Sequence, residues 1–164
     1  MKIMLGTFFL LLVWASPSYA QTPLCPGDPG GVYNVKCYGA KGDLRVATGS
    51  CSTATPNALN ISSGPFTVAD VGKSVLLKGA NPAGNLLATS ITAYVSPTQV
   101  TISPGCGTTV GSTVEWFTDD TAAINAALAD ARGKGNGFFP CGDYATMGVN
   151  ATNWPGGRIT TAGG

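Results

Sequence analysis

The sequence of 164 residues contains no histidine, and charged residues make up only 10% of it. The absence of histidine excludes mechanisms built on imidazole, including Ser-His-Asp triads and most zinc sites. The net charge is +1 and the basic residues form no cluster, so nucleic acid is not an expected partner. No Cys-x-x-Cys pair occurs to indicate zinc or redox chemistry.

Long hydrophobic runs are also missing, except in the first twenty residues. Lys2 precedes an apolar run over Met4–Trp14, and Ser18-Tyr19-Ala20 is a small-x-small cleavage site. This pattern is typical of an export signal, and the run is shorter than the ~20 residues needed to span a bilayer. We therefore predict a signal peptide over 1–20, a secreted (extracellular or periplasmic) protein, and no membrane association after cleavage.

The remaining residues, 21–164, are long enough for one domain. They are rich in Gly, Thr, Ser, Ala, Val and Asn, a composition that favours β-structure with many turns. Apolar and polar residues alternate over Val32–Cys37, which predicts a strand that ends in the glycine turn Gly39–Asp43. A second strand is predicted over Gly137–Pro140, and a third begins at Tyr144.

One helix is predicted after Thr118. Thr118 or Asp119 can act as the N-cap, and Asp119 and Asp120 place negative charge at the positive end of the helix dipole. Gly133 or Gly135 ends the helix. Four apolar residues share one helical face at the expected spacing: Ile124, Ala127, Leu128 and Ala131.

Taken in order, the segments Val32–Asp43, Thr118–Asn125 and Phe138–Tyr144 resemble the N-terminal cap of the pectate-lyase-like right-handed β-helix proteins. That superfamily includes polygalacturonases, rhamnogalacturonases and phage tailspikes. The resemblance implies a mainly β fold with one capping α-helix, in which the chain forms the N-terminal cap and first rungs of a right-handed parallel β-helix. The domain over 21–164 would then be truncated, because solenoid coils need at least ~3 repeats for stability.

Residues 44 to about 117 are interpreted as a small antiparallel β insertion between the first two of these segments. The insertion opens with a loose Ser/Thr/Asn/Pro stretch over Thr48–Pro65. Strand-like runs follow it, at Ser74–Lys78, Leu86–Tyr94 and Gln99–Ser103.

All five cysteines lie in the exported portion, where disulfides are expected. Cys51 and Cys106 lie at the two edges of the insertion and are predicted to pair. Cys37 and Cys141 both lie in segments that carry the resemblance and are the second candidate pair, which would leave Cys25 free. Spacing alone does not fix the connectivity.

The adjacent pair Asp119-Asp120 is the candidate for the two carboxylates that a glycosidase needs. We favour a structural helix cap for Thr118, Asp119 and Asp120, because an apolar helical stripe follows at once. Asp43 and Asp143 are interpreted as turn residues. The catalytic motifs of polygalacturonases belong to later rungs and are absent, so no catalytic residue, metal site or cofactor is assigned.

Two features of the sequence bear on carbohydrate. Trp154, in the polar loop Asn150–Gly157, is the aromatic residue chosen as a candidate for substrate contact. Asn60-Ile61-Ser62 and Asn150-Ala151-Thr152 are glycosylation sequons.

The resemblance implies the N-terminal portion of a secreted protein that acts on or binds a pectin-like extracellular polysaccharide. The catalytic rungs would be missing from this chain, so it would be inactive as it stands. The alternative is a non-catalytic carbohydrate-binding or surface scaffold module. Whether the parent protein is an enzyme stays open.

Overall fold

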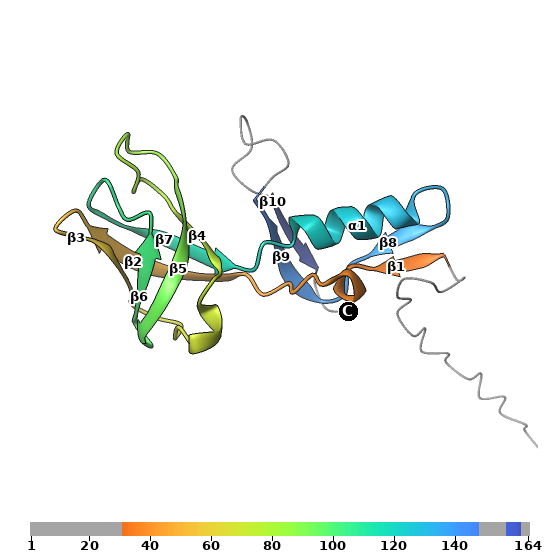
Figure 1. The fold of residues 1–164 in the computed structure, drawn as a ribbon, viewed down its shortest axis with the longest axis horizontal. Helices are drawn as coiled ribbons and strands as arrows, with labels where there is room; N and C mark the ends of the chain where they lie inside the picture. The colour runs from red at the N-terminus through yellow and green to blue at the C-terminus, as the bar shows by residue number, and fades with distance from the viewer. Residues whose placement is uncertain (1–30, 148–156, 162–164) are drawn as a thin grey trace, which may run out of the picture.

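The computed structural model describes residues 31–147 and 157–161, which form a barrel and a smaller part that contains the helix (Figure 1). The predicted signal peptide, Cys25 and Trp154 lie outside the described residues. The elements in chain order are β1 (Val32–Asn34), the 3-10 helix η1 (Val35–Tyr38), β2 (Arg45–Ser52), β3 (Thr55–Ile61), the 3-10 helix η2 (Val68–Asp70), β4 (Ser74–Leu77), β5 (Leu87–Ser96), β6 (Gln99–Ser103), β7 (Val110–Phe117), α1 (Thr121–Ala131), β8 (Asn136–Phe138), β9 (Gly142–Thr146) and β10 (Gly157–Thr161).

Six strands close into a barrel in the order β2-β3-β6-β5-β4-β7. Every neighbouring pair is antiparallel, including the β2–β7 and β4–β7 pairs that complete the closure. Each of the six strands is paired on both sides, so the barrel has no exposed strand edge of the kind that promotes aggregation. In β2, Ala47 and Cys51 face the interior while Thr48 and Ser50 are exposed, as the two-residue period of a strand requires.

The barrel interior is the main hydrophobic core. Trp116 is 1% exposed and its ring centroid lies 4.9 Å from that of Phe66. The Cys51–Cys106 disulfide joins β2 to the loop after β6, and both cysteines belong to this core. Fully buried aliphatic side chains from four strands fill the rest of the interior: Leu59, Val75, Leu77, Val100, Ile102 and Val114.

Gly49 lies where two neighbours of β2 approach its backbone closely. A Cβ at this position would lie 2.6 Å from the Asn60 carbonyl oxygen and 2.5 Å from Val114 Cγ2. Gly111, on the adjoining strand β7, has no atom within 4 Å of the corresponding position. The two glycines therefore differ in the space around them although both lie in barrel strands.

We expect Gly49→Ala to lower the free energy of unfolding by about 1–3 kcal/mol, because the added methyl overpacks a closed interior. Gly111→Ala is the matched control and should change stability by no more than about 0.5 kcal/mol. Urea unfolding followed by the fluorescence of buried Trp116 measures both. Equal midpoints for the two variants would contradict the crowding at Gly49.

Apart from η2, which lies between β3 and β4, the remaining elements form what we call the helical unit: β1, η1, α1, β8, β9 and β10. Strands β1 and β8 pair in parallel over three residues each, and β9 pairs antiparallel with β10. Ile124 and Ala127 of α1 pack against Val35, Ala40 and Tyr144. In Figure 1 the barrel and α1 lie at opposite ends of the molecule, joined through the segments between η1 and β2 and between β7 and α1.

The expectation of a right-handed parallel β-helix is wrong. Parallel pairing among the described strands is limited to β1–β8, with two isolated bridges at Asp43–Asp143 and Asp119–Ala145. Strand β9, which contains the strand predicted to begin at Tyr144, runs antiparallel to β10. The larger part of the fold is a closed antiparallel barrel. The described residues are mainly β with one α-helix, as predicted.

Part of the predicted strand pattern is confirmed and part is wrong. The runs at Ser74–Lys78, Leu86–Tyr94 and Gln99–Ser103 correspond to β4, β5 and β6. The stretch Thr48–Pro65, expected to be loose, contains most of β2 and all of β3. Most of its exposed residues are Ser, Thr or Asn, and this polar face hides the alternation of buried residues in the sequence.

Candidate functional site

The charged groups that contact one another most closely lie where the barrel meets the helical unit. Lys73, just before β4, places its Nζ 2.8 Å from Asp43 Oδ2 and 2.8 Å from Asp70 Oδ1. The Asp70 side chain is 2% exposed and that of Lys73 is 14% exposed. We call these three residues the junction cluster.

Hydrogen bonds from neighbouring segments hold both carboxylates of the junction cluster. The backbone N–H and the hydroxyl of Thr118 donate to Asp43 at 2.9 and 3.0 Å. The same two groups of Thr67 donate to Asp70 Oδ2 at 2.7 and 3.0 Å. The cluster therefore connects the η2 turn, the start of β4 and both segments that lead to the helical unit.

The surroundings keep all three groups of the junction cluster charged. Burial acts to raise the pKa of Asp43 and of Asp70, but the hydrogen bonds with Lys73 and with the threonines outweigh it, so both pKa values lie below the ordinary 3.8. Burial acts to lower the pKa of Lys73, and its bonds to the two carboxylates raise that pKa above 10.5. None of the three is poised to exchange a proton near neutral pH, as a general acid or base should be.

An apolar cluster packs beside these charges. Leu76 of β4 and Phe117 of β7 contact Leu44 and Ala145, which belong to the helical unit and its connection. Phe117 is 1% exposed. The contact between the barrel and the helical unit therefore combines a small buried apolar surface with charged groups that are held in fixed orientations. This arrangement indicates a role in holding the two parts of the fold together.

Asp120 holds the loop before β2. Its carboxylate is 1% exposed and accepts hydrogen bonds from Lys41 N at 2.6 Å and Gly42 N at 3.1 Å. Asp120 is the N-cap residue of α1, but its side chain makes no capping bond to the helix. Its carboxylate therefore fixes tertiary structure rather than the helix terminus.

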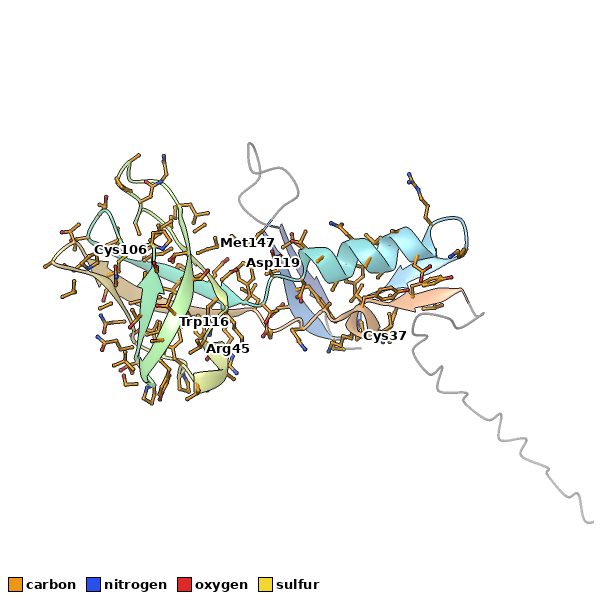
Figure 2. All side chains as sticks on the ribbon, viewed as in Figure 1. Cys37, Arg45, Cys106, Trp116, Asp119 and Met147 are labelled. Atoms are coloured by element: carbon orange, nitrogen blue, oxygen red, sulfur yellow. A yellow bond between two sulfur atoms is a disulfide. The ribbon has the colours of Figure 1, made fainter. Side chains whose placement is uncertain are left out.

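The side chain that reaches the start of α1 belongs to Asp119. It accepts from Thr121 N at 3.0 Å and from Met147 N at 3.2 Å, and Figure 2 shows Asp119 and Met147 beside each other. Thr118 bonds to Asp43 and not to the helix. The three residues predicted to cap the helix therefore have three different roles.

A second polar group lies at the C-terminal end of α1. The Tyr38 hydroxyl donates to Asp130 Oδ2 at 2.6 Å, and Lys134 Nζ lies 2.9 Å from Asp130 Oδ1. The hydrogen bond to Asp130 raises the pKa of Tyr38 to about 12. Lys134 is 61% exposed, so this group is a solvated surface contact.

The barrel carries a groove of about 360 Å³ on its outer surface. Its lining residues come from β3, β5 and β6 and include no ionisable side chain. They are Thr55, Pro56, Asn57, Ala58, Val95, Gln99, Val100 and Thr101. We call this surface the neutral groove.

A second hollow, of about 400 Å³, lies between α1 and β8. Leu128 lines it and is 45% exposed, which differs from the buried position expected from the helical spacing. Arg132 is the charged residue in its lining. The other three residues of the predicted helical face, Ile124, Ala127 and Ala131, are buried.

The predicted disulfides have different outcomes. Cys51 and Cys106 are bonded, with their Cα atoms 6.3 Å apart. Cys37 is disulfide-bonded whereas Cys141 is a free, exposed thiol, so the predicted Cys37–Cys141 pair is wrong. A shared motif does not bring two cysteines to bonding geometry, since a disulfide requires specific Cα separation and Cβ direction.

The described residues contain no group of three or more His, Cys, Asp or Glu side chains able to hold a metal ion. Within the same part of the chain, no helix has the length and apolar character needed to cross a membrane. Trp154, the predicted carbohydrate contact, lies outside these residues.

The junction cluster and the neutral groove were not predicted from the sequence. A capping box formed by Thr67 and Asp70 precedes Lys73, and the Thr-x-x-Asp spacing is a recognisable signal for it. The role of Asp43 had no local signal, because its partners Lys73 and Thr118 lie 30 and 75 residues along the chain. The neutral groove combines residues from β3, β5 and β6. It could not be predicted without the order of these strands around the barrel.

No family model matches this chain, and no match was found among curated proteins or solved structures. The resemblance to the pectate-lyase-like superfamily therefore has no support from these comparisons, and the antiparallel barrel contradicts the fold that it implied.

Proposed function

We propose that this chain is an exported, non-catalytic module whose barrel binds a neutral polysaccharide in the neutral groove. The signal-like residues 1–20 support export, and the Cys51–Cys106 disulfide is compatible with an oxidising compartment. The observation that carries the proposal is the chemistry of the groove, which offers hydrogen-bonding groups without charge.

The groove matches the needs of a hydroxyl-rich ligand. Asn57 and Gln99 each present an amide that can donate and accept, and Thr55 and Thr101 present hydroxyls that do both. Sugar hydroxyls also donate and accept, so the two surfaces are complementary. No cation lines the groove to pair with uronate carboxylates, which favours a neutral polysaccharide over a pectin-like one.

The arrangement of the carboxylates argues against catalysis. Hydrolysis of a glycosidic bond uses two carboxyl groups with separated pKa values that flank the substrate. Asp43 and Asp70 are bonded to Lys73, and Asp120 is bonded to two backbone N–H groups. None of these aspartates lines the neutral groove.

Affinity electrophoresis of the unglycosylated chain tests this function. Gels containing neutral polysaccharides should retard the protein, and gels containing polygalacturonate should not. The double variant Asn57→Ala/Gln99→Ala should bind about tenfold or more weakly, since two hydrogen bonds of about 1 kcal/mol each are lost. Asn85→Ala, which changes an exposed asparagine outside the groove, is the matched control.

Two results would contradict the proposal. Retardation that the double variant leaves unchanged would place binding elsewhere, and release of reducing ends from a polysaccharide would show a catalytic chain. The second candidate is a surface scaffold module without a carbohydrate ligand. It is favoured by the absence of an aromatic side chain from the groove lining, and it predicts no retardation in any gel by a fully folded protein.

A further inference from the structure

The geometry points to Asn60 as an N-glycosylation acceptor whose glycan projects from the outer surface of the barrel at the edge of the neutral groove. Asn60-Ile61-Ser62 is an acceptor sequon. The inference rests on the export that the proposed function includes, but not on the ligand of the groove.

Asn60 faces away from the barrel core. Its neighbours in β3, Leu59 and Ile61, are 0% and 5% exposed and point into the interior, whereas Asn60 is half-buried on the opposite face. Strand pairing places Ser50 on one side of it and Gln99 on the other. Ser50 is small and exposed, which leaves space on that side for a sugar ring.

The hydrogen bond that positions Asn60 is compatible with the modification. Gln99 Nε2 donates to Asn60 Oδ1 at 2.9 Å. A glycan is attached at Nδ2 and the amide keeps its carbonyl oxygen, so the same bond persists in the modified protein. Gln99 also lines the neutral groove, and this places the attached sugar at the groove edge.

The sequon serine indicates when the transfer occurs. In the folded barrel, the Ser62 hydroxyl donates to Thr48 O at 3.0 Å and Ser62 N donates to the same oxygen at 2.9 Å. A transferase that needs this hydroxyl must act before β2 and β3 close. The donor is an oligosaccharide linked to a lipid pyrophosphate: the C1–Nδ2 bond forms, the C1–O bond to the pyrophosphate breaks, and the amide releases one proton.

Expression of the full chain in a yeast secretory pathway tests the proposal. The secreted protein is analysed by mass before and after treatment with an endoglycosidase that leaves one sugar, and its peptides are mapped. We expect the peptide containing Asn60 to carry the residual sugar. Asn60→Gln and Ser62→Ala should lose it, and Ser62→Thr, which keeps both the sequon and the hydroxyl, should retain it.

Further measurements separate acceptor function from misfolding. Asn150→Gln should leave the sugar on Asn60, because the second sequon is independent. The glycosylated chain should also keep the Cys51–Cys106 disulfide and resist protease as the unglycosylated chain does. An unmodified Asn60 in the secreted protein would overturn the inference, and so would glycosylated molecules that lack the disulfide. These readouts do not involve polysaccharide binding, so failure of the proposed function is recorded separately.

Discussion

Replacing Lys73 with methionine should lower the free energy of unfolding by about 2–4 kcal/mol at neutral pH. Removing one partner of a buried charge pair is expensive, because the remaining charge is left desolvated and unpaired. Here two carboxylates, Asp43 and Asp70, would lose the ammonium group that lies 2.8 Å from each. We place the effect below that of a fully buried pair because the Asp43 side chain is 29% exposed.

The deficit of this variant should depend on pH. In the wild type the folded-state pKa values of Asp43 and Asp70 lie below 3.8, so their contribution to stability is present above that value and is lost as pH falls through the lowered values. The pKa of Lys73 lies above 10.5, so its contribution is present below 10.5 and is lost as pH rises through the raised value. The difference between wild type and Lys73→Met should therefore be largest at neutral pH and shrink in acid.

Lys134→Met is the matched control for this experiment. It removes the same kind of side chain from the exposed ion pair with Asp130, and surface pairs contribute little to stability. Thermal and urea unfolding of both variants from pH 2 to pH 8 measure the difference. If Lys73→Met unfolds with the wild-type midpoint at pH 7, the junction cluster does not stabilise the fold.

Replacing Cys51 and Cys106 together with alanine should destabilise the protein by about 4 kcal/mol. The estimate follows from the loop-closure entropy that a crosslink removes from the unfolded chain, for cysteines 55 residues apart in sequence. Domains of this size have unfolding free energies of about 5–15 kcal/mol, so the loss is a large share of the total. Urea unfolding by fluorescence and circular dichroism provides the measurement.

Cys141→Ala is the control for the disulfide variant, since Cys141 is free and exposed. It should unfold at the wild-type midpoint. Addition of a reductant to the wild-type protein, which also reduces the disulfide of Cys37, should cause at least the loss seen in the double alanine variant. A double variant as stable as the wild type would show that the bridge adds nothing to the barrel.

Local features of the fold could be predicted from the sequence because short-range rules determine them. The helix near Thr121–Ala131 and the strands β4, β5 and β6 follow from capping residues, spacing and alternation. The Cys51–Cys106 pair could be predicted because these two residues bracket one segment. The error over Thr48–Pro65 arose because the outward face of β2 and β3 is composed of the residues that usually mark loops.

The pairing of strands could not be predicted in this way. A strand of alternating residues can pair in parallel or antiparallel, and nothing in its own sequence decides between them. The resemblance of three short segments therefore led to a parallel β-helix outside the insertion. Within the insertion, antiparallel strands were predicted, but not the closure of six of them into a barrel over Arg45–Phe117. The roles of Asp43 and Asp120 were missed for the same reason, because each acts across more than 70 residues of sequence.

The closed barrel is the claim on which the groove, the junction cluster and the glycan position all depend, and backbone NMR tests it most directly. Antiparallel strands bring α-protons of opposed residues close together. The structure predicts α-proton and amide nuclear Overhauser effects between Val75 and Trp116 across β4–β7, and between Ala47 and Val114 across β2–β7. Observation of both sets, together with the contacts expected across the other four strand pairs, would establish closure. Their absence, with contacts instead between parallel strands of successive coils, would contradict the account.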